Sequence, residues 1–193
     1  MGQKLGPKRT AADTRQLIFR AASQILIDEG LSSMTLAKVA QQAGLSKGGL
    51  LYHFPNKVAL VDAIFEYHNG IFEDRLNVLS REEGDAPGAW LKAYARASVE
   101  QISDSETASL YASLFAAEEA YASAHAKMRQ KYINWQEKVE NSGLDPNWAL
   151  LIRLTVDGLW FSQMHQYGPP NQTQQDWLVN KIMELVDSPL SKI

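Results

Sequence analysis

Residues 35–57, TLAKVAQQAGLSKGGLLYHFPNK, decide the fold, because they predict two short helices joined by a tight turn. Apolar residues recur along the first helix at intervals of three, four and seven, which gives this helix one buried face. These residues are Leu36, Val39, Ala40 and Ala43. The second helix is predicted from Lys47 to about Phe54. Two helices in this arrangement, the second one basic, have the shape of a helix-turn-helix that reads DNA.

Boundary residues mark both ends of these helices. Thr35 and Ser46 are expected to cap the two N-termini, because a hydroxyl accepts a hydrogen bond from an N–H that lacks an intrahelical partner. Gly44 occupies the position where a helix end favours left-handed backbone. Pro55 ends the second helix, and Asn56 is expected to cap the next one.

One face of the second helix is expected to meet DNA. This face presents Ser46, Lys47, Gly49, Tyr52 and His53, opposite the predicted core residues Leu50, Leu51 and Phe54. Gly48 and Gly49 each cost about 1 kcal/mol relative to alanine inside a helix. Either the missing Cβ atoms let the backbone approach base edges or a phosphate, or the first turn is frayed and tolerates glycine.

The run from Arg15 to Leu60 resembles the N-terminal domain of TetR-type transcriptional repressors. The shared pattern has an apolar first helix ending in a small-residue turn, a threonine opening the second helix, a Gly-Leu-Ser turn, and a short helix ending in an aromatic residue, histidine and phenylalanine. The matching residues here are Ala21, Ala22, Gly30, Thr35, Val39, Ala40, Ala43–Ser46, Gly48, Leu50, Tyr52–Phe54, Lys57 and Leu60. The resemblance covers roughly the first third of the chain.

The resemblance implies a double-stranded DNA operator as partner, with its phosphate backbone touched by Lys57 and by Thr35 or a neighbour of Thr35. Family members often carry a tyrosine directly after the leucine of the recognition helix, and here that position is Leu51. The phosphate contact expected of that tyrosine is therefore in question, and Tyr52 and His53 are the side chains that can replace it.

Charge is distributed unevenly along the chain. The whole chain has a formal net charge of −3, which alone argues against a nucleic-acid partner. Residues 1–60 contain eight Lys and Arg against three Asp and Glu, a charge of +5, and the remainder contains eleven against nineteen, a charge of −8. A basic head on an acidic body suits a protein that docks one end on phosphate. The leader with Lys4, Lys8 and Arg9 is either a basic arm that reaches DNA or an unstructured tail.

Length and composition narrow the remaining classes. The chain has 193 residues, 45% of them hydrophobic, and no cysteine, so it holds a core and no disulfide. No apolar run approaches the roughly 18 residues of a membrane span, and no signal peptide opens the chain. We therefore expect a cytoplasmic protein that does not associate with membranes.

Every later segment also predicts helix. The predicted ranges are 57–81, with a kink at Asn69-Gly70, then 89–102, 106–117, 121–140, 145–166 and a last helix capped by Thr173. The expected fold is all-α, with three helices in a DNA-binding head and five or six in a helical-bundle body. The expected domains are residues 1–55, which bind DNA, and residues 56–193, which bind a ligand and dimerise.

The last two predicted helices are apolar on more than one face, so both of their sides need to be covered. The resemblance to TetR-type proteins implies a homodimer in which these helices form a four-helix interface. The candidate interface residues are Leu151, Leu154, Trp177, Leu178, Ile182 and Val186. Two heads related by a two-fold axis imply an inverted-repeat operator.

Aromatic residues recur on successive helices of the body, and they are either plain core or the lining of an apolar ligand pocket. The candidate lining residues are Trp90, Tyr94, Tyr111, Phe115, Trp135, Trp160, Phe161 and Met164, with Asp157 and His165 as the nearest polar groups. The resemblance implies a small-molecule effector of unknown identity whose binding releases the protein from DNA.

Two other functional classes fit the sequence less well. An enzyme with a di-metal site needs Glu-x-x-His motifs, and none of the four histidines has a glutamate three residues before it. Nucleotide-binding and nucleophile-elbow motifs are absent too, so no catalytic residue, metal or cofactor is expected. A partner-binding adaptor would explain the acidic body, but it would not explain the head with a charge of +5.

Overall fold

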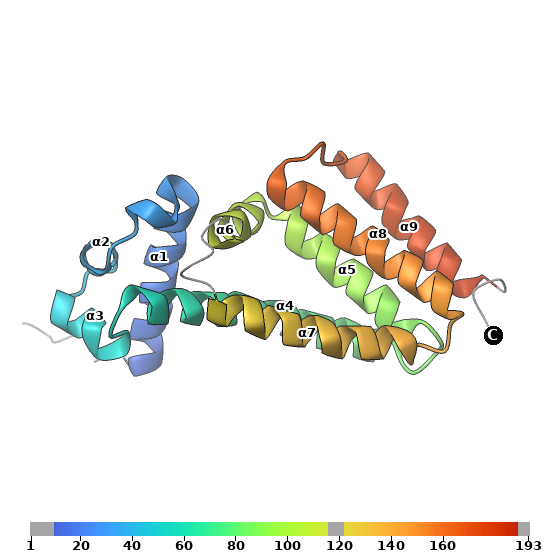
Figure 1. Cartoon of the computed structure of the whole chain (residues 1–193), viewed down its shortest axis with the longest axis horizontal. Coiled ribbons are helices and arrows are strands. Elements are labelled where there is room, and N and C mark those ends of the chain that lie inside the picture. Colours follow the sequence, from blue (N-terminus) through green and yellow to red (C-terminus); the bar gives the residue numbers. More distant parts are fainter. Residues whose placement is uncertain (1–9, 116–121, 189–193) are drawn as a thin grey trace, which may run out of the picture.

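The computed structural model describes residues 10–115 and 122–188, and these residues form nine helices and no strand (Figure 1). The head consists of α1 (Ala11–Ser33), α2 (Leu36–Gln42) and α3 (Lys47–His53). The body consists of α4 (Lys57–Glu83), α5 (Ala89–Ser103), α6 (Ser105–Phe115), α7 (Ala122–Glu140), α8 (Pro146–His165) and α9 (Gln172–Asp187). The all-α fold predicted from the sequence is confirmed.

Side-chain caps set the helix boundaries of the head as the sequence predicts. Thr35 and Ser46 each accept a hydrogen bond from the backbone N–H three residues on, at 3.2 and 3.0 Å. Asn56 caps α4 in the same way at 2.8 Å. Gly44 has a left-handed φ of 66° after α2, and Gly30 interrupts α1 with a φ of 75°. Glycine adopts such angles without the strain that a Cβ atom adds.

Two local predictions in the body were wrong. Thr173 does not cap α9, since the helix begins after Asn171, whose side chain accepts from the backbone N–H of Gln174 at 3.0 Å. The Gln174 side chain accepts in return from the Asn171 backbone N–H, so the two residues form a capping box. Helix α4 also runs unbroken through Asn69 and Gly70.

Two clusters of buried side chains stabilise the molecule. The first joins the head to the start of α4 and to α6, and it includes Ile18, Ile25, Leu50, Phe65, Leu110, Tyr111 and Leu114. The second joins the rest of α4 to α5, α8 and α9, and it includes Phe72, Leu91, Tyr94, Val156, Ile182 and Val186. Helix α4 extends from the head along the length of the body (Figure 1). The head therefore shares one core with α6 and with the first half of α4.

Two of the residues predicted at a dimer interface belong to this second cluster instead. Ile182 and Val186 are only 3% and 0% exposed, because α9 packs this face against α5. Their assignment to an intermolecular surface was wrong, since one apolar face of α9 is used within the protomer. No described helix has the length and apolarity required to cross a membrane.

Candidate functional site

Helix α3 lies at the end of the head that is remote from α8 and α9 (Figure 1). Leu50 and Phe54 are buried, and this packing decides which face of α3 points outward. The exposed residues on or beside this face are Thr35, Ser46, Lys47, Gly48, Gly49 and Tyr52, while His53 and Lys57 are half-buried. Tyr52 is 86% exposed, so its ring and hydroxyl are free to meet another molecule.

Leu51 was predicted to join the core, but it is exposed beside Tyr52. A single turn of α3 has room for one inward residue, and Leu50 takes that place. The position where related proteins often carry a tyrosine therefore points to solvent in this chain, and Tyr52 is the exposed aromatic residue next to it.

The two lysines of the predicted DNA-binding surface differ in their surroundings. Lys57 Nζ donates a hydrogen bond to the backbone oxygen of Leu31 at 2.6 Å, which ties the start of α4 to the end of α1. Lys47 is exposed in the first turn of α3, and this turn contains no acidic residue. A positive charge is unfavourable at a helix N-terminus, so nothing in α3 itself stabilises Lys47 there.

The two glycines of α3, Gly48 and Gly49, differ in the space available for a Cβ atom. A Cβ atom at position 49 would lie 3.2 Å from Ser46 Oγ, the atom that caps the helix, so crowding within the head partly accounts for Gly49. A Cβ atom at position 48 would meet no atom of the described residues within 4 Å. Internal packing therefore gives no reason for glycine at position 48. The basic leader with Lys4, Lys8 and Arg9 lies outside the described residues.

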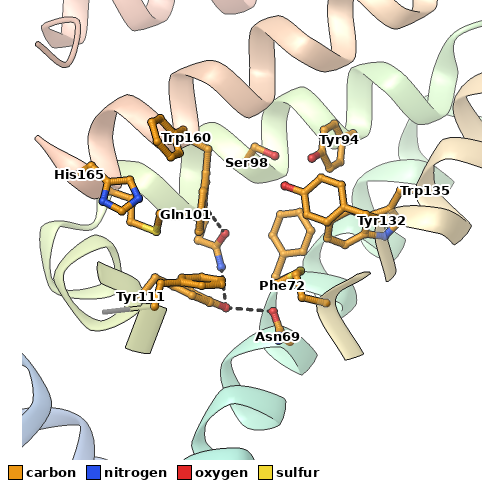
Figure 2. A pocket seen from close by; sticks show the side chains of 14 residues that line it. Asn69, Phe72, Tyr94, Ser98, Gln101, Tyr111, Tyr132, Trp135, Trp160 and His165 are labelled. Carbon is orange, nitrogen blue, oxygen red and sulfur yellow. Dashed lines mark hydrogen bonds between the residues drawn. The ribbon is translucent and has the colours of Figure 1, made fainter. Parts of the chain in front are cut away.

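A cavity of about 350 Å³, partly open to solvent, lies between α4, α5, α6, α7 and α8 (Figure 2). Eight of the ten residues predicted as ligand contacts line this cavity. They are Tyr94, Tyr111, Phe115, Trp135, Trp160, Phe161, Met164 and His165. The aromatic residues of successive helices thus converge on one space, instead of only filling separate parts of the core.

Trp90 and Asp157, which were also predicted to line the pocket, lie behind Tyr94 instead. The Trp90 ring stacks on the Tyr94 ring with centroids 5.1 Å apart. Asp157 accepts a hydrogen bond from Tyr94 Oη at 2.6 Å and pairs with Arg153 Nη1 at 3.0 Å. Both residues hold Tyr94 in place, so their direct contact with a ligand was predicted wrongly.

Six lining residues were missed by the sequence reasoning. They are Asn69, Phe72, Ser98, Gln101, Met128 and Tyr132. Ser98 and Gln101 follow Tyr94 by four and seven positions on α5, so helical spacing was a signal that they share its face. For Asn69 and Phe72 the sequence contained no indication of a place in the cavity wall. Helix α4 is long, and its sequence does not show which other helix packs against which of its faces.

Four polar lining residues form one chain of hydrogen bonds across the cavity wall (Figure 2). Trp160 Nε1 donates to Gln101 Oε1 at 3.1 Å, and Gln101 Nε2 donates to Tyr111 Oη at 3.3 Å. Tyr111 Oη donates in turn to Asn69 Oδ1 at 3.3 Å. This chain joins α8, α5, α6 and α4.

The described lining residues include no lysine, arginine, aspartate or glutamate. Burial raises the pKa of Tyr111 well above its usual value and raises the pKa of Tyr132 to about 12. Burial, with the neighbouring Tyr132 and Asp157, raises the pKa of Tyr94 as well. All three phenols therefore keep their protons at neutral pH, and the tyrosines add no charge to the cavity.

An exposed apolar surface lies on the outer side of α8 and α9. Leu151, Leu154, Phe161 and Trp177 are 49%, 51%, 50% and 58% exposed, respectively, and Leu178 is half-buried. Gly158 lies between Leu154 and Phe161 on α8, and a Cβ atom there would meet no described atom within 4 Å. This α8–α9 face combines large apolar side chains with one position where a second helix can come close.

Two protein families match the chain over most of its length. The family described as bacterial regulatory proteins of the tetR family matches residues 18–64, and the tetracyclin repressor-like C-terminal domain matches residues 88–187. The chain therefore belongs to the TetR family of transcriptional regulators, as the sequence predicted. This membership places it among regulators and not among enzymes.

Individual relatives resemble mainly the N-terminal part. The chain is 35% identical over 57 residues to the transcriptional repressor BepR of Brucella suis, an alignment that covers 30% of this chain and 27% of that protein. It is 31% identical over 86 residues to the nucleoid occlusion factor SlmA of Edwardsiella ictaluri, which covers 44% of this chain and 42% of that protein. The chain thus matches less than half of the length of these curated relatives.

The whole fold is similar to that of NalD, the secondary repressor of the MexAB-OprM multidrug efflux pump in Pseudomonas aeruginosa. The TM-score is 0.68 at 16% identity, and the match covers 91% of this chain and 98% of NalD. At this identity the similarity concerns the fold alone.

Proposed function

We propose that this protein is a homodimeric repressor that binds an inverted-repeat operator through α3 and leaves the operator when a small molecule occupies the body cavity. The observation that carries the proposal is that a cavity lined mainly by aromatic residues shares residues with the core of the head. Tyr111 and Met164 line the cavity, and both belong to the buried cluster that contains Ile18 and Leu50. BepR and NalD are named as repressors, which supports repression.

DNA binding is assigned to the exposed surface around α3. Lys47 and Lys57 would approach phosphates, with Thr35 and Ser46 beside them, and Tyr52, His53 and the Gly48-Gly49 backbone would lie in the major groove. The charge of +5 on residues 1–60 supports this orientation, because neutralising phosphates supplies the sequence-independent part of the affinity.

Dimerisation is assigned to the α8–α9 face. Exposed apolar patches of this kind mark interaction surfaces, and the gap at Gly158 allows the backbones of two helices to approach. A two-fold axis at this face would place two heads on two half-sites of one operator.

Release is assigned to α6. A molecule in the cavity would displace Tyr111 or Met164, and the shared core would pass this movement to α1. The ligand then favours one of two arrangements of the head by its difference in affinity for them.

The experiment that tests DNA binding starts by selecting bound sites from random duplexes, which should return an inverted repeat. Affinity for the selected site is then measured by fluorescence anisotropy between about 50 and 200 mM salt. In Lys47→Ala we expect weaker binding and a salt slope smaller by about 1.8 per dimer, because each of the two heads loses one phosphate contact worth about 0.9. Lys57→Ala is a less direct test, since it also removes the bond to Leu31.

The matched control is Lys138→Ala, which removes an exposed lysine at the far end of α7 and should leave affinity and slope unchanged. Equal salt slopes for the wild type and Lys47→Ala would contradict the assignment of α3 to phosphate. Recovery of no common sequence from the random duplexes would contradict operator binding itself.

A further inference from the structure

The hydrogen-bond chain in the cavity wall can run in only one direction. An indole N–H only donates, so Trp160 requires the oxygen of the Gln101 amide on its side and turns the amide nitrogen toward Tyr111. The Tyr111 hydroxyl accepts that N–H and has its own proton left to donate. Asn69 must therefore present Oδ1 to Tyr111, and an amide flip at either residue would bring two donors together.

This direction leaves the amide nitrogen of Asn69 as a donor without an acceptor. Asn69 is only 4% exposed and lines the cavity beside Tyr111 and Phe72 (Figure 2). Within residues 10–115 and 122–188, Asn69 Nδ2 has no hydrogen-bond partner. A buried donor that is left unsatisfied is unfavourable, so a ligand acceptor that reaches Asn69 Nδ2 from the cavity is favoured.

The rest of the lining defines the remainder of the ligand. Among the described lining residues, His165 alone has an acidic or basic side chain, so a charged molecule would lose its hydration without gaining a counter-charge from them. Tyr111 and Trp160 lie on one side of the cavity, and Tyr94 and Trp135 lie on the other (Figure 2). Such walls favour a flat ring system, which can pack against aromatic faces and edges. A dry cavity of about 150 Å³ holds benzene, so about 350 Å³ accommodates two or three rings.

We infer that the ligand of this cavity is an uncharged, flat, two- or three-ring aromatic molecule that carries a hydrogen-bond acceptor, such as a ring carbonyl, directed at the Asn69 amide. The inference rests on the proposed function, because it specifies the effector of the same cavity. Trp160 acts as a positioning residue, since its N–H determines through Gln101 and Tyr111 which end of the Asn69 amide faces the ligand.

Three flat tricyclic probes of similar size separate the contribution of a hydrogen-bond acceptor from that of the aromatic rings. Fluorenone carries a ring carbonyl, fluorene carries no polar group, and carbazole carries an N–H donor. Their binding to the full chain is measured by equilibrium dialysis at neutral pH. We expect fluorenone to bind about tenfold more tightly than fluorene, as one buried hydrogen bond allows, and carbazole to bind no more tightly than fluorene.

Two variants test the origin of this preference. Asn69→Leu removes the amide donor, so fluorenone and fluorene should bind within about twofold of each other while fluorene keeps its wild-type affinity. Trp160→Phe removes the N–H that sets the direction of the chain, so Asn69 can present either amide end. The ratio of carbazole to fluorenone affinity should then rise severalfold.

Trp135→Phe is the matched control, because it makes the same change on the opposite wall, outside the hydrogen-bond chain. It should keep the wild-type order of the three probes. Trp160→Phe also gives a decisive result if Asn69→Leu does not fold, since it leaves Asn69 intact.

The outcomes distinguish the inference from the proposed function. Equal binding of fluorenone, fluorene and carbazole to the wild type, unchanged in Trp160→Phe, would overturn the role of Asn69 but leave the cavity as the ligand site. Tighter binding of fluorene-9-carboxylate than of fluorene would overturn the requirement for an uncharged ligand. Binding of none of the probes would overturn the inference together with the cavity as the effector site.

Discussion

Position 48 holds a glycine in the first turn of α3, although alanine would stabilise a helix by up to about 1 kcal/mol. The described protein has open space where a Cβ atom would lie, so the cost is not imposed by packing. In the proposed DNA-binding mode, close approach of the α3 backbone to DNA would account for the glycine, so a substitution here should affect stability and affinity in opposite directions.

We expect Gly48→Ala to raise the free energy of unfolding by up to about 1 kcal/mol and to weaken operator binding about tenfold or more. Urea unfolding measures the first effect and fluorescence anisotropy the second. Gly70→Ala in α4, where a Cβ atom also meets nothing within 4 Å of the described residues, should give a similar gain in stability and unchanged affinity. Wild-type affinity in Gly48→Ala would mean that the first turn merely tolerates glycine.

His68 is a second residue with a distinct role, at the contact between α4 and α1. Its Nε2 atom and Ser23 Oγ share a hydrogen bond of 3.2 Å. Burial lowers the pKa of His68 below its usual value of 6.5, and the nearby Asp104 opposes this shift. The folded protein therefore binds fewer protons here than the unfolded chain, so the stability contributed by this site is present above about pH 6.5 and is lost as the pH falls through the folded pKa.

His68→Gln should reduce the loss of unfolding free energy between about pH 7 and pH 5, because glutamine does not titrate and can still bond to Ser23. Urea unfolding at several pH values measures this loss. If His68→Gln loses as much stability on acidification as the wild type, burial of His68 is not a source of the pH dependence.

Among the elements, α6 belongs to two parts of the molecule at once. Tyr111 lines the cavity, while Leu110 and Leu114 pack with the core of the head. Ser113 Oγ also donates to the backbone oxygen of Leu26 in α1 at 2.9 Å. A shift of α6 caused by a ligand would therefore move α1 directly.

Ser113→Ala should weaken the coupling between ligand and DNA without removing either binding site. We expect unchanged probe affinity, and a roughly three- to tenfold smaller effect of saturating fluorenone on operator affinity, as loss of one hydrogen bond allows. Anisotropy titrations with and without the probe measure this factor. Ser103→Ala is the control, because Ser103 makes the same kind of bond within α5 to Val99. An unchanged factor in Ser113→Ala would exclude this contact from the coupling.

For the whole molecule, the decisive feature is that the protomer leaves large apolar side chains exposed on the α8–α9 face. Leu154 and Trp177 are more than half exposed, whereas Ile182 on α9 is buried in the protomer. Helix α3 lies at one end of the molecule, and α9 runs toward the other end (Figure 1). A dimer formed here would therefore leave both heads free for DNA.

We expect Leu154→Asp to sediment as a monomer at micromolar concentration, because a buried, unpaired charge is unfavourable at an interface. Its operator affinity should fall by about a hundredfold or more, since the second head no longer benefits from the first being bound. Ile133→Asp, at an exposed apolar residue of α7 outside this face, is the control. A dimer of Leu154→Asp that binds the operator normally would place the interface elsewhere.

The sequence by itself determined the helices of this protein and most of their boundaries. A capping side chain such as Thr35 or Ser46 accepts a hydrogen bond from a backbone N–H three residues away. Both partners of such a contact are therefore close in the sequence, and a local sequence pattern is enough to predict it. The cap of α9 was predicted at Thr173, but Asn171 two residues earlier caps the helix, so local chemistry alone did not identify the capping residue there. The helix boundaries of the head were predicted well because the contacts that set them are local in this sense.

Only the tertiary structure decided which residues share the cavity and which face of each body helix is covered. Trp90 and Tyr94 are aromatic residues one turn apart on α5, yet only Tyr94 reaches the cavity. The amide donor of Asn69, which has no partner among the described residues, depends on side chains from four helices meeting at one wall. Helical periodicity shows which residues share one face of a helix. Which helix covers that face is decided by packing between segments distant in the sequence, and a local sequence pattern does not contain this information.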